Sequence, residues 1–208
     1  MTMKYWSVPK MWPGEHVAIL ASGPSMSQEI ADRVGRSAVR TIAINTTFQL
    51  APWADMLYAA DGMWWDRHWK HAKGFQGLKV TIEPNFKPEL LMLGNDKAGT
   101  SGFTDDPTKV RSGSNSGYQA ICIAALAGAK KISLYGFDMK SIDNKHHWHG
   151  VHVSPLRNHG ESMYGRWLKN FEALAPEMTK RGIEVINCTP GSALKVFPFY
   201  AEPQQLAA

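Results

Sequence analysis

The clearest candidate for chemistry in the sequence is the turn Ser22-Gly-Pro-Ser25, which follows a short apolar run from His16 to Ala21. Glycine lets the chain turn tightly and expose backbone N–H groups, and a helix that starts after the turn presents its positive end to phosphate. The turn therefore predicts a site for a nucleotide or a nucleotide-activated donor, contacted by Ser22, Gly23, Pro24 and Ser25. Because the patterns GxGxxG and GxxxxGK[ST] are absent, a purely structural turn is the alternative.

Polar residues follow other short apolar runs in the same way. Asn45 offers a donor and an acceptor to a base, ribose or phosphate, or else ties the end of a strand to its own loop. The segment Ser114-Asn-Ser-Gly117 offers hydroxyls and backbone amides to a ligand, or else caps the helix that follows. Beyond the turn, the residues predicted to bind the donor are Asn45, Asp61, Asn115, Ser116, Gly117 and Asp138.

A histidine-rich stretch, residues 139–160, contains His146, His147, His149, His152 and His159. No carboxylate or cysteine joins these histidines at a recognised ligand spacing, so we predict no metal site. A single histidine acting as general base is the better interpretation, because an acceptor hydroxyl must lose its proton and histidine titrates near neutral pH.

Aromatic residues have two interpretations. They can stack on a sugar or a base, but aromatic residues at helical spacing are also typical of a core. This applies to Trp64, Trp65, Trp69, Trp148 and Trp167. Tyr164 has the same ambiguity, since its hydroxyl can reach a donor phosphate while its position fits an apolar stripe shared with Leu168 and Phe171.

Short apolar strands alternate with helical stretches along most of the chain, which predicts an α/β fold with a single Rossmann-like, doubly wound, mainly parallel sheet. We expect one domain over residues 1–208, with a long excursion over about 83–114 and a lid-like insertion over about 139–160. Ligands of such sheets bind outside the carboxyl ends of the strands, so the polar residues at strand ends should gather at one edge. The strands are predicted at residues 16–21, 41–45, 55–60, 79–82, 131–135 and 183–187, and the clearest helix at 115–128.

The net charge and the length of the apolar runs indicate which classes of partner to expect. The 208 residues carry a formal charge of +5, which favours phosphorylated or polyanionic partners. The apolar runs are shorter than the roughly 20 residues that cross a bilayer, and residues 1–13 do not resemble a signal peptide. We therefore expect no membrane insertion and a cytoplasmic location.

Four segments together resemble the family 42 sialyltransferases and the related pterin-diphosphokinase-like and uncharacterised proteins, some of them encoded by bacteriophages, that share a Rossmann-like core. The segments are Ala18 to Ser25, Ala43 to Asn45, Asn115 to Asp138 and Ile186 to Ser192. Two departures stand out: Ser22 occupies the place of an asparagine in those enzymes, and Asp61 stands near the place of another.

The resemblance implies roles for individual residues. Ser22 to Ser25 and Asn45 would contact the nucleotide, and Ser116 and Gly117 would lie near the donor. Those enzymes place a general-base histidine shortly before the penultimate helix, where this chain has His159. Tyr164 is the nearest analogue of the tyrosines that steady the leaving phosphate.

These features predict a glycosyltransferase-like enzyme that moves a group from a nucleotide or nucleotide sugar to an acceptor hydroxyl on a saccharide or a nucleic acid, with no required cofactor. The first alternative is diphosphate transfer from ATP, for which carboxylates such as Asp61 and Asp138 would hold Mg²⁺. The second is a nucleotide-binding or nucleic-acid-binding protein without turnover.

Overall fold

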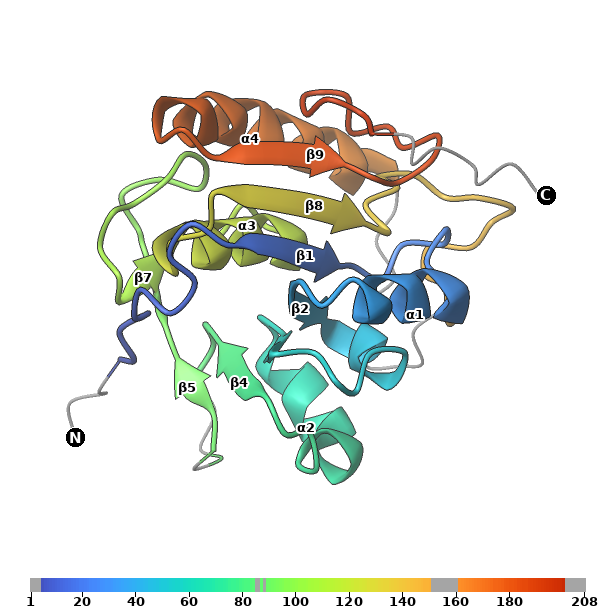
Figure 1. The fold of residues 1–208 in the computed structure, drawn as a ribbon, viewed down its shortest axis with the longest axis horizontal. Helices are drawn as coiled ribbons and strands as arrows, with labels where there is room; N and C mark the ends of the chain where they lie inside the picture. The colour runs from blue at the N-terminus through green and yellow to red at the C-terminus, as the bar shows by residue number, and fades with distance from the viewer. Residues whose placement is uncertain (1–4, 85–86, 88, 151–160, 201–208) are drawn as a thin grey trace.

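The computed structural model describes residues 5–84, 87, 89–150 and 161–200, and its centre is a seven-stranded sheet in the order β5-β4-β3-β2-β1-β8-β9. Every strand of this sheet pairs in parallel with its neighbours (Figure 1). The strands are β1 (His16–Leu20), β2 (Arg40–Ile44), β3 (Met56–Tyr58), β4 (Leu78–Thr81), β5 (Leu91–Met92), β8 (Lys131–Tyr135) and β9 (Glu184–Asn187). The predicted α/β, Rossmann-like fold is confirmed.

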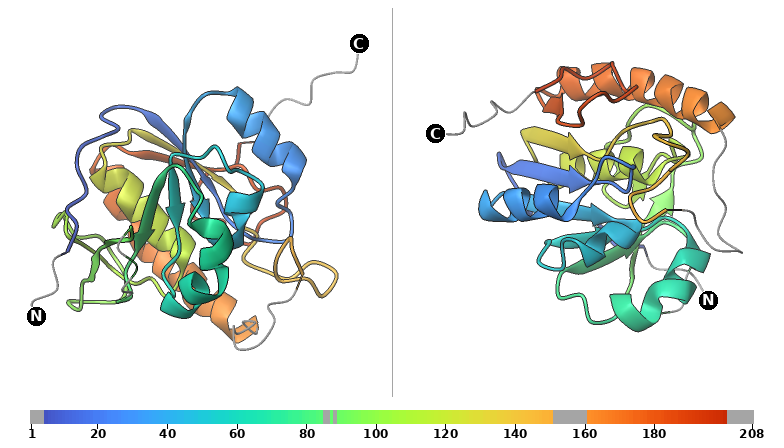
Figure 2. Two further views of the ribbon diagram at one scale, coloured as in Figure 1. Left: turned by 90° about the horizontal axis from the view of Figure 1, so that it is seen from below. Right: turned by 90° about the vertical axis from the view of Figure 1, so that its right-hand side faces the viewer.

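Helices cover both faces of the sheet (Figure 2). They are α1 (Gln28–Arg36), α2 (Gly62–Ala72), α3 (Ser116–Leu126) and α4 (Glu161–Lys180), with a 3-10 helix, η1 (Asn45–Gln49), after β2. Alternate residues of β1 show the two layers: Val17 and Ile19 belong to the core formed with α3 and α4, whereas Ala18 and Leu20 belong to the core formed with α1 and α2. Near-continuous apolar strands are expected when a parallel sheet is buried on both faces.

The chain changes direction in the sheet next to β1. From β1 it builds outward through β2, β3, β4 and β5, and then it returns to add β8 and β9 on the other side of β1. A crevice forms at such a switch point because the connections leave in opposite directions, and ligands of open α/β sheets bind there. The β1–β8 junction is therefore the place to look for a site.

The helix predicted at 115–128 is found as α3, and its predicted ends are confirmed. The side chain of Asn115 caps the helix by accepting a hydrogen bond from the N–H of Tyr118 at 3.1 Å. Gly128 follows the helix with a φ of 100°, a left-handed conformation that glycine adopts without strain. Ten of its residues are buried, which agrees with their small and apolar character.

The excursion over residues 83–114 contains β5 at the sheet edge and a separate parallel pair, β6 (Gly94–Asn95) with β7 (Lys109–Val110). It packs on α3, since the Tyr118 hydroxyl donates to the carbonyl of Gly102 at 2.5 Å and Val110 is fully buried. Within the described residues, no helix is long and apolar enough to cross a membrane.

Candidate functional site

A cavity of about 440 Å³ lies at the carboxyl ends of β1, β2, β3 and β8, at the switch point of the sheet. The residues predicted from strand ends and turns meet there although they are distant in sequence. Those that line the cavity are Ser22, Gly23, Pro24, Asn45, Asp61, Asn115, Ser116, Gly117, Asp138 and Tyr164. Ser25 does not line the cavity, and His159 lies outside the described residues.

The turn after β1 approaches the end of β8 very closely. The Gly23 N–H donates to the carbonyl of Gly136 at 3.0 Å, and a Cβ at position 23 would lie 2.3 Å from that carbonyl oxygen and 2.1 Å from Oδ2 of Asp138. Only glycine fits this approach, because real Cβ atoms do not come so near to other heavy atoms. The glycine of the turn thus serves contact between two strand ends as well as the turn itself.

Ser25 acts on the cavity through Asp138. Its hydroxyl donates to Oδ2 of Asp138 at 2.9 Å, and its N–H donates to the same oxygen at 3.3 Å. Asp138 is 1% exposed, and its other oxygen, Oδ1, is buried without a hydrogen-bond partner among the described residues. Burial raises the pKa of Asp138 above its ordinary value, while the bonds from Ser25, the residue's own backbone N–H and the charge of Lys140 act against that rise.

The N-terminus of α3 opens onto the cavity with a neutral cap. The side-chain oxygen of Asn115 accepts from the N–H of Tyr118, and the first turn has no acidic residue. In the described part of the chain, the N–H groups of Ser116 and Gly117 donate to no acceptor, as expected for the first turn of a helix. Gly117 packs on Phe137, whose ring would lie 2.5 Å from an added Cβ. The arrangement favours an anion at these two amides.

The N-terminus of α2 also borders the cavity, but two carboxylates occupy it. Oδ1 of Asp61 accepts from the N–H of Met63 at 2.7 Å, and Oε2 of Glu83 accepts from the N–H of Gly62 at 2.8 Å. Asp61 was predicted to bind the donor; it does line the cavity, and it is also the N-cap of α2. This side of the cavity is therefore suited to hydroxyls or cations rather than to phosphate.

Asn45 follows β2 as the first residue of η1 and has a left-handed conformation, with a φ of 50°. Asparagine tolerates this conformation better than most residues, and non-glycine residues held there cluster at functional sites. Its side chain forms no hydrogen bond with any other described residue, so its amide is available to a ligand. The alternative prediction was that the Asn45 side chain ties the strand to its own loop, but no hydrogen bond from this side chain to the loop is present among the described residues.

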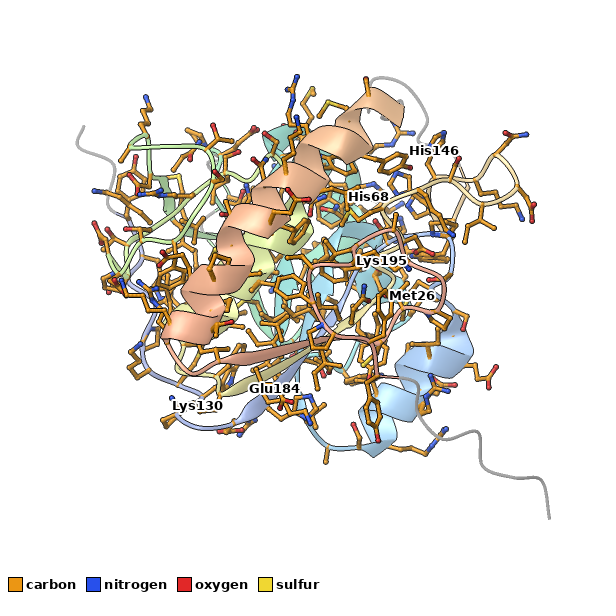
Figure 3. All side chains as sticks on the ribbon, turned by 90° about the horizontal axis from the view of Figure 1, so that it is seen from above. Met26, His68, Lys130, His146, Glu184 and Lys195 are labelled. Carbon is orange, nitrogen blue, oxygen red and sulfur yellow. The ribbon has the colours of Figure 1, made fainter. Side chains whose placement is uncertain are left out.

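Two histidines of the histidine-rich segment, His146 and His147, line one side of the cavity. Nδ1 of His146 lies 2.9 Å from the hydroxyl of Tyr164 on α4, and Nδ1 of His147 lies 3.3 Å from the hydroxyl of Ser22. Figure 3 shows His146 on the loop after β8, close to the start of α4. Trp148 fastens the same loop to η1, because its indole N–H donates to the hydroxyl of Thr47 at 3.1 Å.

The core interpretation is confirmed for three of the tryptophans. Trp64 and Trp65 are buried residues of α2, and Trp167 is a buried core residue of α4 that also lines the cavity beside Tyr164. Across residues 5–84, 87, 89–150 and 161–200, no three His, Cys, Asp or Glu side chains lie close enough together to hold a metal ion.

Several cavity residues were not singled out as ligand-binding from the sequence. They include Glu83, Lys140, His146 and His147. Glu83 lies two residues after β4, which ends at Thr81, so the rule that found Asn45 would also find Glu83. His146 and His147 were considered as metal ligands, and only the folded loop shows their contacts with Tyr164 and Ser22.

Residues 189–193 support the site from behind. The Thr189 hydroxyl accepts from the N–H of Phe137 at 2.9 Å, and the N–H of Ala193 donates to the carbonyl of Asp138 at 2.8 Å. These bonds hold the end of β8 in place.

Comparisons of the chain with protein-family models, with curated proteins and with solved structures found no match.

Proposed function

We propose that this chain is a glycosyltransferase-like enzyme that binds a nucleotide-activated donor in the cavity and transfers a group from it to an acceptor hydroxyl. The observation that carries the proposal is that a neutral helix N-terminus, with two available amides, shares one cavity with a histidine–tyrosine pair. The first can hold a phosphate, and the second can handle a proton.

The donor's phosphate belongs at Ser116 and Gly117, where the positive end of α3 stabilises negative charge. That charge grows as the bond between the donor carbon and the phosphate oxygen breaks, so these amides stabilise the leaving group more than the starting donor. Asn45 and the Ser22 turn would contact the nucleoside, in agreement with the resemblance to the family 42 sialyltransferases.

The acceptor hydroxyl must lose its proton as its oxygen attacks the donor carbon. In the tautomer in which Nδ1–H of His146 donates to the Tyr164 oxygen, Nε2 carries the lone pair that can accept this proton. His159, which the resemblance indicates as the base, lies outside the described residues, so His146 is a second candidate for the same role. The acceptor is a saccharide or a nucleic acid, and the charge of +5 is compatible with either.

The test is a thermal-shift screen of nucleotides and nucleotide sugars, with and without Mg²⁺. A ligand present at about 100 times its Kd stabilises the folded state by about 2.7 kcal/mol, which raises the Tm of a domain of this size by roughly 5–10 °C. Asn45→Gly should abolish the shift, since it removes the amide and keeps the left-handed backbone accessible. A flat response to every nucleotide, together with retention of labelled DNA, would favour the nucleic-acid-binding alternative.

Turnover is measured separately, as release of nucleoside phosphate from the donor that binds best. His146→Gln and His159→Gln, compared under the same conditions, identify the base by the larger fall in kcat at unchanged donor affinity. Binding with no release from any donor, with or without acceptor, would support a protein that binds nucleotides without turnover.

The second candidate is diphosphate transfer from ATP, which one observation favours. Asp61 and Glu83 both reach the first turn of α2, and each has a second carboxylate oxygen. Mg²⁺ is commonly held by one or two carboxylates together with substrate phosphates. An ATP shift that requires Mg²⁺ and disappears in chelator, with AMP as a product, would place this candidate first.

A further inference from the structure

The carboxyl group of Asp138 is buried, and one of its two oxygens has no hydrogen-bond partner among the described residues. It lies at the end of β8, beside the turn after β1, with 1% of the residue exposed. Oδ2 receives both the hydroxyl and the N–H of Ser25, whereas Oδ1 has no partner within the described residues. A native structure rarely leaves a buried polar atom unpaired without a reason such as a missing ligand.

The side chain cannot simply turn to pair Oδ1. The two bonds from Ser25 hold Oδ2, and Gly23 packs so close to that oxygen that no Cβ fits between them. The carbonyl of Asp138 is held in turn by the N–H of Ala193. Oδ1 is thus a buried oxygen held in one position in a residue of the cavity wall, and a fixed acceptor is suited to a fixed donor on a ligand.

We propose that Oδ1 of Asp138 accepts a hydrogen bond from a sugar hydroxyl next to the phosphate of the bound donor. The inference rests on the proposed function and names a contact in the same site. In a nucleotide, the hydrogen-bond donors nearest to the phosphate are sugar hydroxyls, and the phosphate itself belongs at the α3 amides of the same cavity.

In dinucleotide-binding Rossmann folds an acidic residue after the second strand binds a ribose hydroxyl, and this sequence lacks an acid at that place. Asp138 would take over that role. Asn45, which follows β2, can share a hydroxyl but carries no charge, while Asp138 follows β8, on the other side of β1 from β2. A hydrogen bond from the same hydroxyl would stabilise the ionised carboxylate, and it would therefore act against the rise in the pKa of Asp138 that burial causes.

The experiment measures Kd by calorimetry for CMP, UMP, AMP and GMP, for their 2′-deoxy and 3′-deoxy forms, and for the matching nucleotide sugars. It compares the wild type with Asp138→Asn, which keeps the size of the side chain. Asp143→Asn is the matched control, because Asp143 is exposed on the same loop and does not line the cavity.

We expect wild type to bind the preferred ribonucleotide about 10- to 100-fold more tightly than one of its deoxy forms, the usual range for a hydrogen bond to a charged group. Asp138→Asn should lose that ratio, and Asp143→Asn should keep it. A penalty of Asp138→Asn seen only with nucleotide sugars would assign the hydroxyl to the transferred sugar instead of the ribose.

Equal affinities for all ribose and deoxy forms in the wild type, together with nucleotide-sugar binding unaffected by Asp138→Asn, would overturn this inference and leave the proposed function standing. Absence of binding by every nucleotide would overturn both. The wild-type comparison of ribose and deoxy forms needs no variant, so the assignment to a ribose hydroxyl stays testable even if Asp138→Asn fails to fold.

Discussion

The two helices whose N-termini border the cavity, α2 and α3, differ in what occupies their first turns. Asp61 and Glu83 place carboxylates on the N–H groups of α2, whereas α3 has the neutral cap Asn115 and two amides without partners within the described residues. Both helices have 11 residues and the same direction relative to the sheet edge. Their backbone dipoles are therefore comparable, and the side chains decide which end is available to an anion.

The difference teaches that helix geometry alone does not make a phosphate site. A helix N-terminus attracts an anion only if its own sequence has not already supplied one. For the proposed nucleotide ligand, the arrangement favours one orientation, with phosphate towards α3 and hydroxyls or cations towards α2.

The largest expected effect comes from making α3 resemble α2. Ser116→Glu places a carboxylate at the first position of α3, where it competes for the free amides and repels phosphate. We expect the affinity for the preferred nucleoside monophosphate to fall at least ~100-fold. The Tm should stay equal or rise, because a carboxylate in the first turn stabilises a helix by about 0.3–1 kcal/mol.

Calorimetry and thermal unfolding of the same samples measure both effects. Gln76→Glu is the control for net charge, since Gln76 is exposed in the turn just before β4, away from the cavity. Unchanged nucleotide affinity in Ser116→Glu would show that the phosphate does not bind at α3.

A matched pair of glycines gives the next effect. Gly117→Ala brings a Cβ to 2.5 Å from the ring of Phe137, which is fully buried, whereas a Cβ at Gly62 in the first turn of α2 meets no atom nearer than 3.5 Å. Gly117→Ala should lower the free energy of unfolding by about 1–3 kcal/mol through overpacking. Gly62→Ala should be neutral or stabilising by up to about 1 kcal/mol, because alanine is the better helix former.

Urea unfolding of the two variants measures this pair. Similar losses in both would mean that the close packing of α3 on the end of β8 does not constrain position 117.

The carboxyl groups of the cavity differ as the helices do. Asp61 and Glu83 receive N–H groups of α2, whereas Oδ1 of Asp138 receives no bond from any described residue. The pKa of Asp138 is raised above 3.8 by burial, so below pH 3.8 its carboxyl is protonated in both the folded and the unfolded state. As pH rises through the folded pKa, ionisation of the buried group lowers the stability of the folded protein.

Asp138→Asn removes that ionisation. At pH 7 the variant should unfold with a free energy about 1 kcal/mol higher than wild type, since a neutral amide costs less to bury than a carboxylate, which corresponds to a Tm higher by roughly 2–4 °C. The difference should shrink as pH falls towards 4. A variant equally or less stable than wild type at pH 7 would contradict this sign, and Asp143→Asn serves again as control.

The sequence predicted the sheet and the meeting of its strand ends for a clear physical reason. Buried parallel strands are short apolar runs, and the residue after each run lies at the same edge, so Ser22, Asn45 and Asp138 could be gathered without knowing the strand order. The helix α3 was equally clear because a cap, a run of apolar residues and a terminal glycine occur in sequence.

What the sequence did not show depends on contacts between distant segments. The strands β5, β6 and β7 have two residues each, too few for a period to appear. The meeting of Glu83 with Gly62 requires that β4 lie beside β3, and the approach of Gly23 to Asp138 requires that β8 lie beside β1. The pair of His146 with Tyr164 depends on the path of an irregular loop, which has no period at all.

The smallest expected effect concerns Glu83, whose carboxylate accepts from the N–H of Gly62 in the first turn of α2. Glu83→Gln keeps an oxygen to accept from the N–H of Gly62 but removes the charge near the helix end. At low salt we expect a loss of about 0.3–0.5 kcal/mol in the free energy of unfolding, and almost none in 1 M salt, because exposed charges are screened there. Glu172→Gln is the control, since Glu172 is exposed in the middle of α4, away from either helix end.

The same variant tests the comparison of the two helices by ligand affinity. If phosphate binds at α3, Glu83→Gln should change the Kd for the preferred nucleoside monophosphate by less than about threefold, because Glu83 lies at the other N-terminus and its charge is partly screened. A gain of tenfold or more would mean that Glu83 had been excluding the phosphate from α2. The anion would then belong at α2, and the orientation of the ligand in the cavity would be reversed.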